Sequence, residues 1–144
     1  MEWKKTMNKK LVFVLPLMLS NYAFAENWQN FATYKNHHEE INISSIIQLD
    51  ANVFNVWART VYDSMLQDAS NTFQYNELQS QYVIKCKSHS KALKQIVSYA
   101  DSKSTNSYIV PESDLVFNVA KPNTISDAII KLTCTLGEKN EKQN

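Results

Sequence analysis

The sequence predicts an α+β domain: an antiparallel β-sheet of about five to six strands with one C-terminal helix packed on it. Several segments alternate between apolar and polar residues, which is typical of half-buried strands. One segment near the end has a helical period instead, and the two cysteines fall on these two kinds of element. Because strands come first and a helix follows, the pattern favours a helix covering one face of the sheet.

The first 25 residues have the pattern of a cleavable export signal. Basic residues precede a short apolar run over 11–19, and Ala23-Phe24-Ala25 is an A-x-A site, so cleavage is expected between Ala25 and Glu26. The apolar run is well below the ~20 residues of a transmembrane helix. Translation starts at either Met1 or Met7, and both starts keep this signal.

The signal predicts an exported protein in the periplasm, at the outer membrane or at the cell surface. No cysteine lies near the cleavage site, so no lipid anchor is expected there. The remainder is expected to form one domain over 26–137, followed by a polar tail over 138–144. Without its signal the chain is slightly acidic, which argues against nucleic acid or anionic membranes as main partners.

The first half of the domain is expected to supply three extended regions. Residues 28–34 alternate and predict an aromatic first strand, with a turn over 36–38. Short extended pieces are expected over 41–47. A tight turn over 50–52 then leads into a strand over 53–62, whose two apolar faces predict a central position.

The second half begins with residues 63–71, which lack a clear period and are expected to form a loop. Gln81 to Cys86 then alternate, with Tyr82, Ile84 and Cys86 on an apolar face. The remaining elements expected here are a strand over 92–100, a polar hairpin loop over 101–106, a returning strand over 107–110 and a short extended piece over 115–119.

The helix is expected over 123–137. Thr124 is a plausible N-cap, and Asp127 completes a capping-box-like arrangement near the positive end of the helix. Gly137, the only glycine, is expected to end the helix in a left-handed conformation. The apolar stripe consists of Ile125, Ala128, Ile129, Leu132 and Leu136.

Cys86 and Cys134 are the only cysteines, and an oxidising compartment favours a disulfide between them. Such a bond would fasten the last turn of the helix to the sheet and contribute roughly 4 kcal/mol. The alternative is a pair of buried free thiols.

The sequence contains no motif for enzymatic activity, and we expect none. A chain with one glycine has no phosphate-cradling loop or nucleophile elbow. His37, His38 and His89 are the only candidate ligands for a metal or for haem iron. We interpret them as exposed turn residues, so no metal site and no cofactor is expected from the residues themselves.

Two groups of side chains are candidates for ligand binding. Phe73 and Tyr75 lie at a loop-to-strand junction; we interpret them as core residues, and exposed anchors for a partner are the alternative. Four lysines gather where one strand ends and the next begins; we interpret them as a solvated strand edge, and a basic patch that faces a polyanionic matrix is the alternative. These lysines are Lys85, Lys87, Lys91 and Lys94.

The order of these features is similar to that of the surface-adhesin protein E family of Gram-negative bacteria. Tyr75 ahead of the strand over 81–86, the Val97-Ser98-Tyr99 step and the helix over 125–134 carry the resemblance. It implies a sheet with a C-terminal helix, binding of host vitronectin and laminin, haem binding and a homodimer. Unlike the best-known members, this chain has no basic residue over 71–75, so we expect matrix binding to depend on the four lysines rather than on the loop before Tyr75.

The leading hypothesis is therefore an exported, non-enzymatic binding protein that resembles bacterial surface adhesins. The alternative is a periplasmic structural module, or a module that binds a small ligand such as haem.

Overall fold

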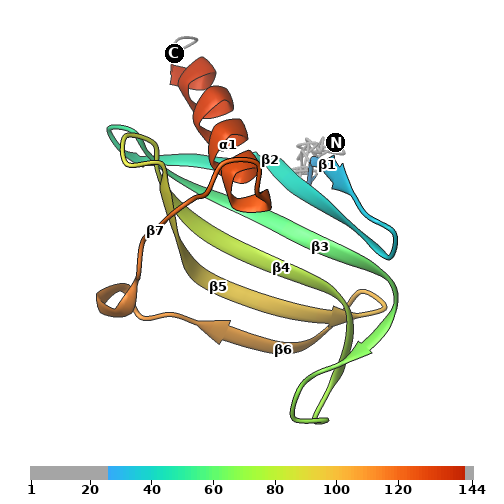
Figure 1. The fold of residues 1–144 in the computed structure, drawn as a ribbon. Coiled ribbons are helices and arrows are strands. Elements are labelled where there is room, and N and C mark those ends of the chain that lie inside the picture. The colour runs from blue at the N-terminus through green and yellow to red at the C-terminus, as the bar shows by residue number, and fades with distance from the viewer. Residues whose placement is uncertain (1–25, 142–144) are drawn as a thin grey trace, which may run out of the picture.

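The computed structural model describes residues 26–141, so the predicted signal over 1–25 and the last three residues of the predicted tail lie outside it. Six strands form an antiparallel meander in chain order, a short seventh pairs with β5, and one helix packs on one face (Figure 1). The predicted antiparallel sheet with one C-terminal helix is confirmed, although the sheet has seven strands rather than the five to six expected. The elements are β1 (Trp28–Thr33), β2 (His37–Asp50), β3 (Val53–Gln67), β4 (Gln74–Lys85), β5 (Ser90–Ala100), β6 (Lys103–Ile109), the 3-10 turn η1 (Glu112–Asp114), β7 (Asn118–Val119) and α1 (Ile125–Glu141).

The first two strands contain bulges that the alternation pattern did not predict. In β1 the register shifts between Asn30 and Ala32, and Phe31 packs against the core. The short pieces expected over 41–47 belong to the continuous strand β2, whose register shifts between Asn42 and Ile47. At this bulge the Ser45 hydroxyl donates to the Asn42 carbonyl (2.7 Å) and accepts from the Trp57 amide (2.8 Å). The bulge lets Ile43 and Ile46, three positions apart, both pack against the core, whereas Ile47 is 58% exposed.

The hairpin between β3 and β4 is longer than predicted, because β3 continues to Gln67 through much of the expected loop. Residues 63–65 are exposed, so this end of β3 extends beyond the core. Its sequence therefore lacks the alternation of apolar and polar residues from which a strand is predicted. The Asp68 carboxylate closes the turn by accepting from the backbone amides of Thr72 (2.6 Å) and Phe73 (2.8 Å).

The hairpin between β5 and β6 is tighter than predicted. Asp101 and Ser102 both have positive φ (47° and 68°), which is typical of a two-residue hairpin turn. The polar residues from Lys103 onward therefore belong to β6 rather than to a loop. The mistaken loop has a simple cause: every residue of this edge strand is exposed, so polarity does not distinguish it from a loop.

The core lies between α1 and the middle strands. Its buried residues come from β2, β3, β4 and α1 and are at most 3% exposed; they are Ile41, Val56, Ala58, Ile84, Ile129 and Ile130. Thr133 is also fully buried on the helix. The predicted apolar stripe is therefore only partly right, because the helix also turns Ile130 and Thr133 toward the sheet.

The start of α1 matches the prediction and its end does not. The Thr124 hydroxyl accepts from the Asp127 amide (3.2 Å), and the Asp127 carboxylate accepts from the Asn123 amide (3.0 Å). The helix continues past Gly137 to Glu141. Gly137 instead allows the helix to approach Phe54, since a Cβ atom there would lie 2.5 Å from a carbon of that ring.

The predicted disulfide is confirmed. Cys86 directly follows β4 and bonds to Cys134 with a Cα–Cα distance of 5.9 Å. Cys134 does not lie on the last turn of the helix, because α1 extends seven residues beyond it to Glu141.

Candidate functional site

The four candidate lysines do not form one patch on one face of the sheet. Lys91 pairs with Ile84, which is buried beneath α1, whereas Lys85 is the next residue along β4 and points to the opposite face. Lys85 Nζ lies 3.9 Å from the ring centre of Phe117. Lys87 is exposed in the turn after β4, and Lys94 lies at the bulge in β5.

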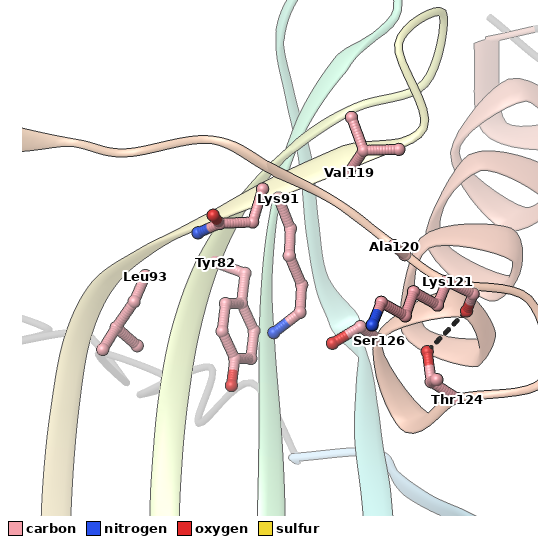
Figure 2. Close-up of a pocket in the computed structure, with 9 residues that line it drawn as sticks. Tyr82, Lys91, Leu93, Val119, Ala120, Lys121, Thr124 and Ser126 are labelled. Carbon is pink, nitrogen blue, oxygen red and sulfur yellow. Dashed lines mark hydrogen bonds between the residues drawn. The ribbon is translucent and has the colours of Figure 1, made fainter.

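Lys91 opens onto a cavity of about 370 Å³ between β5, β7 and the start of α1 (Figure 2). Its ammonium group lies 3.6 Å from the ring centre of Tyr82, and Lys121 lines the same space from the segment before the helix. A second cavity of about 190 Å³ lies next to it and shares Tyr82, Lys91 and Ser126. Sequence reasoning missed Lys121, because only tertiary structure brings it to Lys91.

Phe73 and Tyr75 form part of an aromatic row that runs over β4, β3 and β2 and ends just after β1. The ring centres of Phe73 and Tyr75 are 6.1 Å apart, and Tyr75 meets Tyr62 edge-on at 6.0 Å. Tyr62 then lies 5.7 Å from His37, which stacks on Tyr34 at 4.6 Å. Tyr34 is 47% exposed, and the other four side chains are partly exposed. The structure therefore joins the two predicted anchors to Tyr34 and Tyr62, and to His37, which the sequence had suggested only as a ligand for a metal or haem iron.

The three histidines each pair with an acidic side chain. His37 Nε2 is 3.7 Å from Glu39 and His38 Nε2 is 3.2 Å from Glu40, within β2 rather than in the predicted turn. His89 has a positive φ of 47° and bonds to Asp127 at 2.7 Å. Over residues 26–141, no three His, Cys, Asp or Glu side chains are arranged to hold a metal ion.

Asp127 ties the turn after β4 to the start of the helix. Its carboxylate accepts from His89 and from Lys131, whose ammonium nitrogen is 2.8 Å away. The hydrogen bond from Lys131 lowers the pKa of Asp127 from 3.8 to about 2, and the bonds from the Asn123 amide and His89 act in the same direction, against the effect of burial. We call His89, Asp127 and Lys131 the Asp127 clamp, because their hydrogen bonds hold the turn after β4 against the start of α1, near the disulfide.

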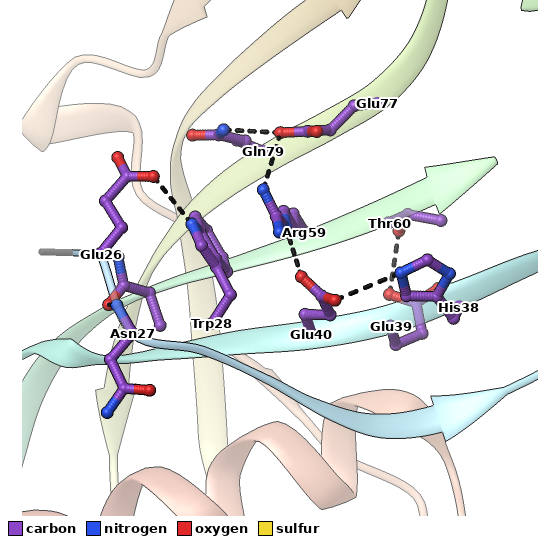
Figure 3. Close-up of polar contacts among 11 residues, drawn as sticks. Glu26, Asn27, Trp28, His38, Glu39, Glu40, Arg59, Thr60, Glu77 and Gln79 are labelled. Carbon is purple, nitrogen blue, oxygen red and sulfur yellow. Dashed lines mark hydrogen bonds and ion pairs between the residues drawn. The ribbon is translucent and has the colours of Figure 1, made fainter. Parts of the chain in front are cut away.

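The face of the sheet opposite the helix carries a second charged cluster, around Arg59 (Figure 3). Arg59 lies 2.5 Å from Glu40 and 3.5 Å from Glu77, and its guanidinium carbon is 4.3 Å from the Trp28 ring centre. Sequence reasoning missed this cluster, although the only arginine of the chain, in a largely apolar strand, was the available signal.

Glu39 points to the face of the sheet that the helix covers. There it is 6% exposed, and its carboxylate accepts a hydrogen bond from the Thr60 hydroxyl at 2.9 Å. Burial raises the pKa of Glu39, and the Thr60 bond and the nearby His37 and His38 only partly oppose this. The carboxyl group lines the smaller cavity beneath the helix.

Among the residues that the structure describes, no helix is long and apolar enough to cross a membrane.

Comparisons with known proteins identify the fold. No protein-family model matches the chain, and no curated protein matches it. Among solved structures, the crystal structure of protein E from non-typeable Haemophilus influenzae is similar, with a TM-score of 0.54 and 13% sequence identity. The match covers 76% of this chain and 78% of that one. The chain therefore shares the fold of protein E, as the strand and helix carrying its two cysteines predicted.

Proposed function

We propose that this protein is an exported, non-enzymatic binding protein that attaches to host matrix proteins such as vitronectin or laminin. The observation that carries the proposal is the fold shared with protein E over most of both chains. The resemblance to the surface-adhesin protein E family supplies the class of partner.

The aromatic row from Phe73 to Tyr34 is the contact surface that we favour. Partly exposed aromatic rings offer large contact areas that lose little side-chain entropy on binding, and such residues are enriched among interface hot spots. The row also extends over separate strands of a rigid sheet, so its rings are held in place before a partner arrives.

Binding of purified residues 26–144 to immobilised vitronectin and laminin tests this proposal. Phe73→Ala and Tyr75→Ala should each weaken binding roughly tenfold or more, as truncation of a hot-spot residue does. Tyr108→Ala is the matched control, because Tyr108 is 59% exposed on β6, outside the row. Wild-type affinity in both row variants would contradict the assigned surface, and no binding by the wild type would contradict the function.

The four lysines are a second candidate contact, which the same assay can test. Neutralising Lys85, Lys87, Lys91 and Lys94 together should weaken binding and flatten its salt dependence if they face an acidic partner. Because Lys85 and Lys91 point to opposite faces, we expect a smaller effect than from the aromatic variants. An unchanged affinity in a folded quadruple variant would remove the lysines from the contact.

A periplasmic module that binds a small ligand is the second candidate function, and the cavity beside Lys91 favours it. Protease treatment of intact cells separates the two locations: cleavage of this chain supports a surface adhesin, and protection supports the periplasm. Haem titration and sedimentation of residues 26–144 test the haem binding and the homodimer that the resemblance implies.

A further inference from the structure

The cavity beside Lys91 has the size and walls of a small-molecule site. Its volume of about 370 Å³ lies in the range of ~300–1,000 Å³ that such sites occupy. One wall is β4 and β5, the second is β7 with the segment that follows it, and the third is the first turn of α1 (Figure 2). The space exists because the chain must cross from the sheet edge at β7 to the helix, above the side chains of β4 and β5.

The charge in this cavity is positive and unpaired. Lys91 and Lys121 both line it, and neither forms an ion pair with any acidic side chain over residues 26–141. Lys131, on the same helix, is already paired with Asp127. In Figure 2 the ammonium groups of Lys91 and Lys121 point toward the Ser126 hydroxyl, which has no hydrogen-bond partner within the described part of the chain. Three donors thus line one cavity, in which an anionic group would be stabilised.

The remaining walls are apolar. The Tyr82 ring and Leu93 form the floor, and Val119 and Ala120 form the side. Val119 is 71% exposed, so this apolar surface is open to solvent. The Tyr82 ring lies against Lys91 and so joins the apolar floor to the charged end. A ligand that satisfies both parts must carry one anionic group and an apolar body.

The buried carboxyl group of Glu39 limits how deeply the anion can enter. It lines the smaller cavity, which shares Lys91 and Ser126 with the larger one, and it accepts a hydrogen bond from the Thr60 hydroxyl. An anionic head group is therefore favoured at Lys121 and Ser126, near the mouth, and disfavoured next to Glu39.

We propose that this cleft binds a small organic carboxylate, with its head group at Lys91, Lys121 and Ser126 and its apolar body on Tyr82, Leu93 and Val119. This ligand site is separate from the aromatic row proposed to bind matrix proteins, and either proposal can fail without the other.

Titration of residues 26–144 with octanoate, followed through backbone amide NMR signals, tests the proposal. Saturable shifts should centre on Leu93, Val119 and Ser126. Octanol and octylamine have the same number of carbons with a neutral or a positive head, and both should bind at least tenfold more weakly, because neither offers an anionic oxygen to the charged donors. Equal binding of the three compounds, or shifts centred elsewhere, would overturn the assignment.

Lysine variants give a second, independent measurement. Lys121→Gln and Lys91→Gln should each weaken octanoate binding roughly tenfold. Lys103→Gln, an exposed residue on β6, is the matched control and should bind like the wild type. Because Lys121 is also exposed, its variant should keep the wild-type unfolding midpoint. Unchanged octanoate affinity in both folded cleft variants would refute the head-group site, whatever the result with matrix proteins.

Discussion

At the scale of single residues, Gly137 and Asp127 decide how the helix sits on the sheet. Gly137 is buried against Phe54, which is itself 1% exposed, so a side chain at this position has no room. Asp127 holds His89 from the sheet side and Lys131 from its own helix. Gly137 acts because it has no side chain, and Asp127 acts through its charge, so a substitution at each position tests one effect alone.

Gly137→Ala should destabilise the protein although alanine is the better helix former. The new Cβ would lie 2.5 Å from the Phe54 ring, and overpacking a core costs about 1–3 kcal/mol, more than the ~1 kcal/mol gained in helix propensity. We expect a net loss of roughly 1 kcal/mol in the free energy of unfolding, measured by denaturant titration.

Two comparisons make this prediction specific. Asn140→Ala, at an exposed position of the same helix, should leave stability unchanged or slightly higher. In a Phe54→Leu background, Gly137→Ala should cost less, because the clashing ring is gone. An unchanged or raised stability of Gly137→Ala in the wild-type background would contradict the close approach.

Asp127→Asn should weaken the dependence of stability on acid pH. The folded pKa of Asp127, about 2, lies below its ordinary value of 3.8, so its stabilisation is full above that value and is lost as pH falls through 3.8 toward 2. The free energy of unfolding of the wild type should therefore fall more steeply than that of the variant in this window.

Denaturant titrations across the acid range measure both slopes. Asp63→Asn, at an exposed position of β3, is the control and should keep the wild-type slope. Identical slopes for wild type and Asp127→Asn would show that the clamp does not act through the charge of this residue.

At the scale of elements, the disulfide joins the helix to the end of β4. Cys86 and Cys134 are 48 positions apart, so the bond closes a long loop in the unfolded chain. The Asp127 clamp lies about two turns earlier on the same helix and contacts the same turn through His89. The helix is therefore attached covalently and electrostatically to one hairpin.

Cys134→Ser should lower the free energy of unfolding by roughly 2–5 kcal/mol, as the loss of a native disulfide does in small secreted domains. Reduction of the wild type should have a comparable effect, because it frees the same helix. Denaturant unfolding with and without reductant measures both. The Cys86→Ser, Cys134→Ser double variant is the control, and its midpoint should not respond to reductant. A wild-type midpoint that reductant does not move would contradict this stabilising role.

At the scale of the whole molecule, the fold accommodates the predicted cleavage before Glu26. The Asn27 carbonyl already accepts from the Ile43 amide (2.9 Å), and the Glu26 carboxylate accepts from Trp28 Nε1 (2.9 Å). Both contacts lie on the domain side of the predicted cut, so cleavage there would leave the sheet intact.

The exported protein should therefore begin at Glu26. Mass spectrometry of the protein recovered outside the cytoplasm measures this directly. Ala25→Arg, which destroys the A-x-A site, should retain the precursor mass, and Asn27→Gln, beyond the site, should be processed as the wild type. An exported wild-type protein that keeps residues 1–25 would refute the signal assignment.

The fold class, the disulfide and the helix start could be predicted from the sequence, because each depends on local pattern or on residue type. Alternation located the middle strands, and the only two cysteines of the chain, together with the predicted export signal, indicated one pairing. The errors lie where the local pattern carries no information. Every residue of β6 is exposed, so the strand was predicted as a loop. Gly137 was predicted to end the helix, because the sequence does not show that it packs against Phe54.

The candidate sites depended more strongly on tertiary structure. The sequence named Lys91, Phe73 and Tyr75, but strand pairing decided that Lys85 faces away from Lys91. The path of the chain between β7 and α1 decided that Lys121 lines the same cavity as Lys91. Pairing likewise brought Tyr62 and His37 to Tyr75. A site requires distant side chains on one surface, and only the register of the sheet and the placement of the helix specify which residues those are.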